Sequence, residues 1–223
     1  MRLVLAFSVL FALAARGEVL FEDDFDSYPD GYDLADSPAW AYFIGSGITI
    51  YDGAATTGPG NRALAAAVGA TVGNDYTVGC DFTGINDADG GKVLLSLRMS
   101  AHYRAQELYY VQAYPDGGGY CLELVYELDG VPETLSGTCL QADQDTWHRL
   151  AVSAVGSGPV DFEVYFDGGL VIIHTEETFI APAGYPGFGF DAEGAAPRLD
   201  NFVQSDGGAG VERVSFGRLK TLF

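Results

Sequence analysis

Two glutamates in the segment YCLELVYEL come nearest, in type and spacing, to the carboxylate pair of a glycan-hydrolysing site. Glu123 and Glu127 share one face of an extended strand, because side chains alternate between the two faces. They are four residues apart, which is about 13 Å along a strand. Retaining glycosidases hold their two carboxyl groups about 5–5.5 Å apart, and inverting ones about 6.5–9.5 Å. The pair alone fits neither mechanism, so we interpret both as solvated carboxylates on a strand face.

A second set of polar residues has the types that abstract a proton beside a sugar carboxylate. Such a site needs a tyrosine or histidine for proton transfer and an arginine or glutamine for the carboxylate. Arg98, Tyr110 and Gln112, with Glu123, would place these groups on the concave face of a sheet. Nearby residues of similar type are His102, Arg104 and Gln106. Arg98 and His102 straddle an expected strand end, and no lyase motif is matched, so this set defines an alternative function and not the preferred one.

Other catalytic and metal signals are weak. His148 and His174 are isolated, and neither has a cysteine or histidine at zinc-ligand spacing. The sequence contains no Gly-x-Ser-x-Gly elbow and no phosphate-binding loop. As the first interpretation we therefore expect a protein without catalytic residues.

Aromatic side chains supply the candidate contacts for a sugar, because an aromatic face stacks on apolar ring faces. We select Trp40, Tyr109, Tyr110 and Tyr114 as candidate ligand-binding residues. Trp40, in SPAWAYF, is the expected exposed tryptophan. Trp147 is expected in the core, because it begins an apolar strand.

Short strands must position these residues. Thirty glycines, thirteen tyrosines and fourteen phenylalanines, with turns at short intervals, are typical of an all-β protein. Segments rich in β-branched and aromatic residues predict strands over 76–82, 92–100, 107–114, 120–128, 149–155, 161–166, 170–176 and 187–193. Asp-Gly pairs between several of them predict tight hairpins. Residues 53–70 lack bulky side chains and are predicted to be mostly loop.

The half-buried pattern of these strands predicts two antiparallel sheets packed face to face. In 120–128, Leu122, Leu124 and Tyr126 fall on one face, and the two glutamates fall on the other. The expected fold is therefore an all-β antiparallel two-sheet sandwich.

Three cysteines allow one intramolecular bridge. Cys121 and Cys139 flank the Asp129-Gly130 turn almost symmetrically, so a hairpin there brings them opposite or diagonal to each other. We predict that this pair forms a disulfide. Cys80 alternates with apolar residues in YTVGCDF and is expected to be a buried free thiol.

The first seventeen residues have the three-part pattern of an export signal. A basic Arg2 precedes an apolar run over 3–15, and small residues follow around Arg16. The apolar run is shorter than the roughly 18 residues that a membrane span needs, and no later segment approaches that length. We therefore expect a signal peptide over 1–17, export to the extracellular space or periplasm, and no membrane span.

The remaining chain is expected to form one domain over 18–205, followed by a flexible linker and short tail over 206–223. Removing Arg2 and Arg16 changes the formal net charge from −20 to −22. Binding to phosphate backbones needs clustered Lys and Arg, so nucleic acid is excluded as an expected partner. An acidic surface suits either solubility or a hard cation.

Three segments carry a resemblance to a known superfamily. They are FEDDFDSYP (21–29), DTWHRLAVSAVGSGPVDFEVYFDGG (145–169) and YPGFGFDAEGAAPRLDNFVQS (185–205). Together they resemble the concanavalin A-like lectin and glucanase jelly rolls, especially the laminin-G-like branch. The resemblance implies that the closing strand pairs near the opening one, and its degenerate motifs support a fold better than a function.

Members of that superfamily often bind calcium through carboxylates at the two chain ends. The resemblance therefore implies a calcium site at Glu22, Asp24 and Asp200, completed by carbonyl groups and water. It also implies a secreted, non-catalytic module that binds a glycan or an extracellular surface partner. The alternative is a polysaccharide lyase or glycoside hydrolase that uses the concave sheet face. The ligand, the oligomeric state and the role of the tail are left open.

Overall fold

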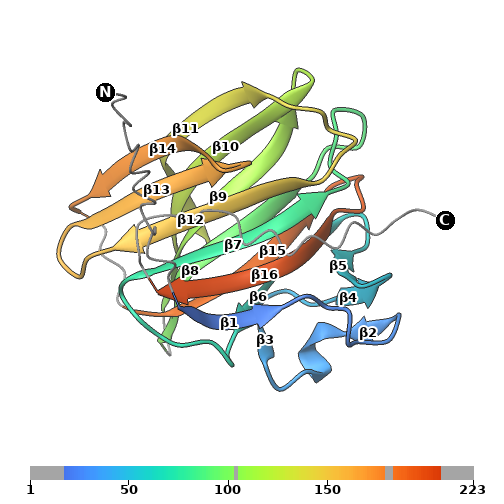
Figure 1. Cartoon of the computed structure of the whole chain (residues 1–223), viewed down its shortest axis with the longest axis horizontal. Coiled ribbons are helices and arrows are strands. Elements are labelled where there is room, and N and C mark those ends of the chain that lie inside the picture. Colours follow the sequence, from blue (N-terminus) through green and yellow to red (C-terminus); the bar gives the residue numbers. More distant parts are fainter. Residues whose placement is uncertain (1–17, 103–104, 179–182, 207–223) are drawn as a thin grey trace, which may run out of the picture.

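The computed structural model describes residues 18–102, 105–178 and 183–206, and within these ranges the chain forms two antiparallel sheets. The expected signal peptide and nearly all of the expected tail lie outside the described residues. The two sheets are stacked face to face (Figure 1). No helix in the described ranges is long and apolar enough to cross a membrane.

The larger sheet has nine strands. Its order is β14 (Gly169–Glu176), β13 (Val160–Phe166), β12 (His148–Val155), β7 (Tyr76–Thr83), β16 (Arg198–Asp206), β5 (Ala54–Thr57), β4 (Ile48–Tyr51) and β2 (Tyr32–Asp33), and β1 (Val19–Asp23) also pairs with β16. A short 3-10 helix, η1 (Leu34–Asp36), follows β2. The pairing of β1 with β16 joins the two ends of the domain, as the resemblance implied.

The smaller sheet has seven strands. Its order is β11 (Val131–Gln141), β10 (Gly119–Leu128), β9 (Ala105–Asp116), β8 (Lys92–His102), β15 (Tyr185–Ala192), β6 (Asn61–Ala67) and β3 (Trp40–Ile44). Strands that are distant in sequence are neighbours in both sheets, which is the pattern of a jelly roll. The predicted all-β, two-sheet sandwich is confirmed.

The core lies between the sheets and follows the period-two pattern. In β10, Leu122, Leu124 and Tyr126 are buried between the sheets, and the intervening side chains face outward. The Asp129-Gly130 turn has positive φ at both residues, as a type I′ hairpin requires.

The prediction that residues 53–70 are mostly loop is wrong, because β5 and β6 occupy most of this segment. The alanines of β6 are small because the neighbouring strand β15 approaches closely. A Cβ atom at Gly187 or Gly189 would collide with the carbonyl oxygen of Ala65 or Ala63. Large rings nearby, including Trp40 and Phe188, fill the space that the alanines leave. Lack of bulk here reflects close packing of strands, not a loop.

The predicted disulfide is confirmed. Cys121 and Cys139 are register partners on β10 and β11 and form a bridge with a sequence separation of 18 residues. Cys80 is a buried free thiol, as expected, and burial raises its pKa. Disulfides of this kind persist in oxidising compartments.

Replacing both Cys121 and Cys139 by serine is expected to lower the free energy of unfolding by about 3 kcal/mol. A loop of this length adds about that much chain entropy to the unfolded state once it is no longer closed. Urea unfolding of the wild type and the double variant, each with and without reductant, measures the effect. Reductant should lower the urea midpoint of the wild type and leave that of the double variant unchanged. Equal stability of the two oxidised proteins would contradict the prediction.

Candidate functional site

The outer face of the seven-stranded sheet carries a cavity of about 300 Å³, which we call the outer-face cavity. Tyr110 and Gln112, which the sequence placed on a functional sheet face, both line it. It is lined by Arg62, Lys92, Leu94, Tyr110, Gln112, Val125, Glu127, Gly130, Pro132, Thr134 and Asp191. These residues come from β6, β8, β9, β10, β11 and β15, and from the turn between β10 and β11.

Strand alternation explains why polar groups gather here. Val93 and Leu95 of β8 are buried between the sheets, so Lys92 and Leu94 face outward. Asp191 of β15 is the register partner of both Lys92 and Arg62. Three charged residues therefore lie in one row across β8, β15 and β6.

The Arg62 side of the cavity contains an ion pair between an exposed arginine and a buried glutamate. The Arg62 Nη2 atom lies 2.9 Å from Oε2 of Glu127, whose side chain is 2 % exposed. Tyr110 also bonds to Glu127. Burial raises the pKa of Tyr110 above its usual value of 10, and the negative charge of Glu127 raises it further. Tyr110 is therefore a neutral hydrogen-bond donor and is poorly suited to act as a base.

The Lys92 side of the cavity contains a chain of polar contacts. The Lys92 ammonium lies 3.4 Å from Oε1 of Gln112 and 5.5 Å from the centroid of the Tyr114 ring. Gln112 and Tyr114 each donate a hydrogen bond to Glu123. Among the described residues, Lys92 forms no ion pair, although Asp191 is its register partner on β15. Its charge is available to a ligand.

The cavity therefore combines apolar groups with donors and acceptors of both kinds. Leu94 and Val125 supply the apolar part, and they are 4 % and 1 % exposed. Sugars present apolar ring faces and many hydroxyl groups, so this composition suits a sugar unit. Glu123 accepts hydrogen bonds from Gln112 and Tyr114, and Glu127 bonds to Arg62 and Tyr110.

Arg98 does not belong to this site, so its proposed place on the outer face is wrong. A bulge between Leu97 and Ser100 turns Arg98 inward, with φ at 51°, and its side chain is fully buried. Its guanidinium donates to the carbonyl oxygens of Asn74 and Gly156. The side chains of His102, Arg104 and Gln106 lie outside the described part of the structure. The lyase-like set is therefore reduced to Tyr110, Gln112 and Glu123.

Two of the four predicted aromatic contacts are core residues. Tyr109 is fully buried between the sheets. Trp40 is only 2 % exposed, and its Nε1 atom donates to Oδ2 of Asp23 at 2.8 Å, so the expectation that it is exposed is wrong. Tyr110 and Tyr114 do face outward, and Tyr110 lines the cavity.

The expectation for Trp147 is also wrong, because this residue is exposed and not buried. It was expected in the core, but it is 46 % exposed, and the next residue, His148, is buried instead. Strand β12 starts at His148, and a shift of one residue moves every side chain to the other face.

The three carboxylates expected to bind calcium do not form a compact group. In the described ranges, the only three potential ligands whose atoms all lie within 4.8 Å of one another are Asp116 and the two disulfide cysteines. Asp24 and Asp200 instead cap backbone N–H groups of nearby residues. The arrangement of Glu22, Asp24 and Asp200 therefore does not fit a calcium site, and calcium binding stays a prediction.

Three cavity residues were missed by sequence reasoning. Arg62 lies in the alanine-rich segment that was read as loop, and Lys92 and Asp191 lie at strand ends. No local motif marks them, because the register of β15 brings them together. The one available signal was that basic residues are scarce, eleven in 223, so that each of them is a candidate for a specific role.

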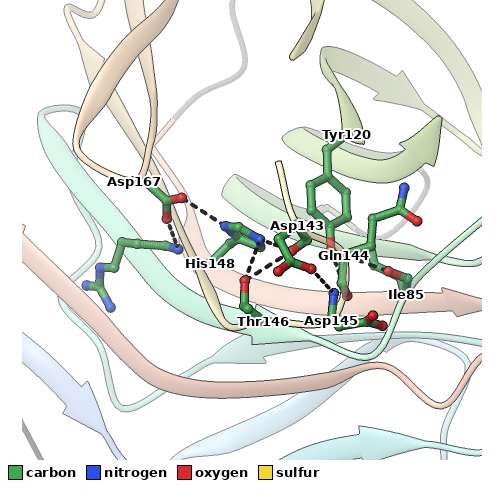
Figure 2. A network of polar contacts seen from close by, with 9 residues as sticks. Ile85, Tyr120, Asp143, Gln144, Asp145, Thr146, His148 and Asp167 are labelled. Atoms are coloured by element: carbon green, nitrogen blue, oxygen red, sulfur yellow. Dashed lines mark hydrogen bonds and ion pairs between the residues drawn. The ribbon is translucent and has the colours of Figure 1, made fainter. Parts of the chain in front are cut away.

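A second polar network fixes the loop before β12 (Figure 2). His148 Nδ1 lies 2.8 Å from Oδ2 of Asp167, and its Nε2 lies 2.6 Å from the carbonyl oxygen of Asp143. Thr146 donates to the same carbonyl oxygen, and the Tyr120 hydroxyl donates to the carbonyl oxygens of Ile85 and Gln144. This network joins the loop to both sheets.

Tyr120 is expected to make the protein less stable in alkali. Burial, together with the negative charge of nearby carboxylates, raises its pKa to about 12. The unfolded tyrosine ionises near 10, so between pH 10 and 12 the unfolded chain binds fewer protons and the free energy of unfolding falls as pH rises. Urea unfolding at pH 9 to 12 should show a shallower fall for Tyr120→Phe. An unchanged slope would contradict this role.

Comparison with known proteins identifies the fold and assigns the chain to no family. No protein-family model matches the chain, and a search of curated proteins finds no match. Solved structures do match. The carbohydrate-binding module CBM66 from Bacillus subtilis has a TM-score of 0.57 at 19 % identity, covering 75 % of this chain and 96 % of that one.

Two enzymes match over similar lengths. The alginate lyase Aly36B has a TM-score of 0.55 at 12 % identity, covering 83 % of this chain and 96 % of its own. The β-glucanase of Bacillus licheniformis has a TM-score of 0.54 at 11 % identity, covering 83 % and 97 %. The chain thus has the concanavalin A-like jelly-roll fold, which carbohydrate-binding and glycan-degrading proteins share.

Proposed function

We propose that this chain is an exported, non-catalytic module that binds a glycan in the outer-face cavity. The observation that carries the proposal is the cavity itself, where an apolar floor meets donors and acceptors on six neighbouring strands. Rigid strands hold these groups, which lowers the cost of ordering them when a sugar binds. The shared fold of a carbohydrate-binding module and two glycan-degrading enzymes supports a carbohydrate ligand.

The state of the ionisable groups favours binding over catalysis. Glu127 is buried in an ion pair with Arg62, and Tyr110 holds its proton because burial and Glu127 raise its pKa. A lyase base needs to accept a proton, and Tyr110 already holds one. Export rests on the signal-like residues 1–17, and the disulfide supports it.

A glycan array probed with the purified protein tests the proposal, with and without a calcium chelator. We expect binding to one class of glycan, and product analysis of each hit should find intact glycan. Cleaved or unsaturated products would replace the binding function with the alternative, a lyase or hydrolase. Binding to no glycan under either condition would refute both and leave an extracellular protein partner as the remaining interpretation. Loss of binding with chelator alone would restore calcium as a cofactor.

A further inference from the structure

The outer face of the other sheet carries a second set of exposed aromatic residues, which the proposed function does not use. Trp147 is 46 % exposed and Tyr51 is 62 % exposed. Arg198 connects them, because its guanidinium carbon lies 5.8 Å from the centroid of the Trp147 ring and its Nη2 atom lies 3.4 Å from the carbonyl oxygen of Tyr51. We call these three residues, with the threonines described next, the Trp147 face.

A row of hydroxyl groups crosses the sheet beside these rings. Arg198 is the register partner of Thr56 on β5 and of Thr83 on β7, and Thr56 is the partner of Thr49 on β4. Leu199, next to Arg198, is buried in the core, so Arg198 and its partners in the row face outward. Neighbouring strands are about 4.8 Å apart, so the row has its polar groups at regular spacing. The Thr56 hydroxyl already donates to the carbonyl oxygen of Pro197, so it would meet a ligand as an acceptor.

Trp147 is held in place on both sides. Its neighbours Thr146 and His148 are anchored by the network in Figure 2, through the carbonyl oxygen of Asp143 and the carboxylate of Asp167. The Arg198 guanidinium in turn bonds to the carbonyl and carboxylate oxygens of Asp52 in the β4–β5 turn. An exposed ring that is already fixed loses little conformational entropy when a ligand stacks on it.

We propose that the Trp147 face is a second carbohydrate-binding surface, which takes a neutral polysaccharide chain. The exposed rings would stack on apolar sugar faces, and the threonine row would meet sugar hydroxyls. Arg198 is already paired with the carboxylate of Asp52, and the whole chain is strongly acidic. An anionic polysaccharide would therefore be repelled. Because the outer-face cavity lies on the opposite sheet, the two surfaces would let one domain contact two chains.

Affinity electrophoresis in gels that contain hydroxyethylcellulose or dextran tests this proposal. We expect the wild type to be retarded by at least one of these neutral polymers, and to be retarded much less by carboxymethylcellulose. Trp147→Ala should weaken the retardation about tenfold, the loss of roughly one stacking contact. Lys92→Met, which alters only the outer-face cavity, should remain retarded. Thermal unfolding of both variants checks that they are folded.

Intrinsic fluorescence gives a second readout, because the chain has two tryptophans and Trp40 is buried. The neutral polymer should shift the emission of the wild type and leave that of Trp147→Ala unchanged. No retardation by either neutral polymer would overturn the proposal, and so would retardation that only Lys92→Met abolishes. Self-association that depends on Trp147, without polymer binding, would overturn it in favour of a second copy of this chain. Glycan-array binding lost only in Lys92→Met would leave the proposed function intact.

Discussion

Replacing Arg98 by methionine is expected to lower the free energy of unfolding by about 3 kcal/mol, because the guanidinium makes two hydrogen bonds as a charged donor. Those bonds join Asn74, before β7, to Gly156, after β12. Methionine keeps the length of the side chain but leaves both carbonyl oxygens without this donor. The Arg98 backbone also donates to the Tyr76 hydroxyl, and that bond should persist.

Equilibrium unfolding in urea measures the change, and Arg149→Met is the matched control. Arg149 lies on the other sheet in an ion pair with Asp81 whose two side chains are 23 % and 28 % exposed, and its removal changes the net charge by the same amount. Exposed ion pairs contribute about 0–1 kcal/mol, and because this pair is partly buried and Arg149 also donates to the carbonyl oxygen of Asn201, we expect a loss near the upper end of that range. A loss at Arg98 no larger than that at Arg149 would contradict the structural role of Arg98. The burial of Arg98 also makes it unsuited to be a catalytic residue.

Replacing Lys92 by methionine is expected to weaken glycan binding about tenfold or more. A hydrogen bond to a charged group contributes about 1.5–3 kcal/mol, and 1.4 kcal/mol corresponds to a factor of ten. Lys92 forms no ion pair among the described residues, so the free energy of unfolding should change little. Methionine keeps an unbranched side chain but removes the ammonium that lies 5.5 Å from the centroid of the Tyr114 ring.

Isothermal titration of a glycan found on the array measures this effect. Arg149→Met again serves as the control, because it removes the same charge from the opposite sheet. Equal weakening by both variants would mean that long-range charge acts on the ligand, and no weakening by Lys92→Met would remove Lys92 from the site.

Local pattern was enough to predict the sandwich. Alternation in β10 predicted its buried face, and the Asp129-Gly130 turn predicted both the hairpin and the disulfide. These features depend on neighbours in sequence, and short-range rules capture them. The strands β5 and β6 were missed because they pair with β16 and β15, strands more than a hundred residues later in the chain.

The candidate site was harder to predict because it depends on register. One bulge sends Arg98 into the core, and a one-residue offset exposes Trp147 and buries His148. Period-two reasoning fails at the bulge, whereas the regular alternation of Leu150 and Val152 in β12 already places Trp147 on the outer face. The row of Arg62, Asp191 and Lys92 likewise follows from pairing between distant strands.

The central claim is that a glycan occupies the outer-face cavity, and thiol labelling tests it most directly. Thr134 is exposed at the cavity on β11, and Thr175 is exposed on β14 of the other sheet. Each is changed to cysteine, Thr134→Cys or Thr175→Cys, and labelled with a maleimide. The native thiol of Cys80 should stay silent, because it is buried and its pKa is raised.

We predict that a saturating concentration of the array-selected glycan slows the labelling of Thr134→Cys and leaves that of Thr175→Cys unchanged. Equal labelling rates at Thr134→Cys with and without bound glycan would contradict the claim that the cavity is the binding site.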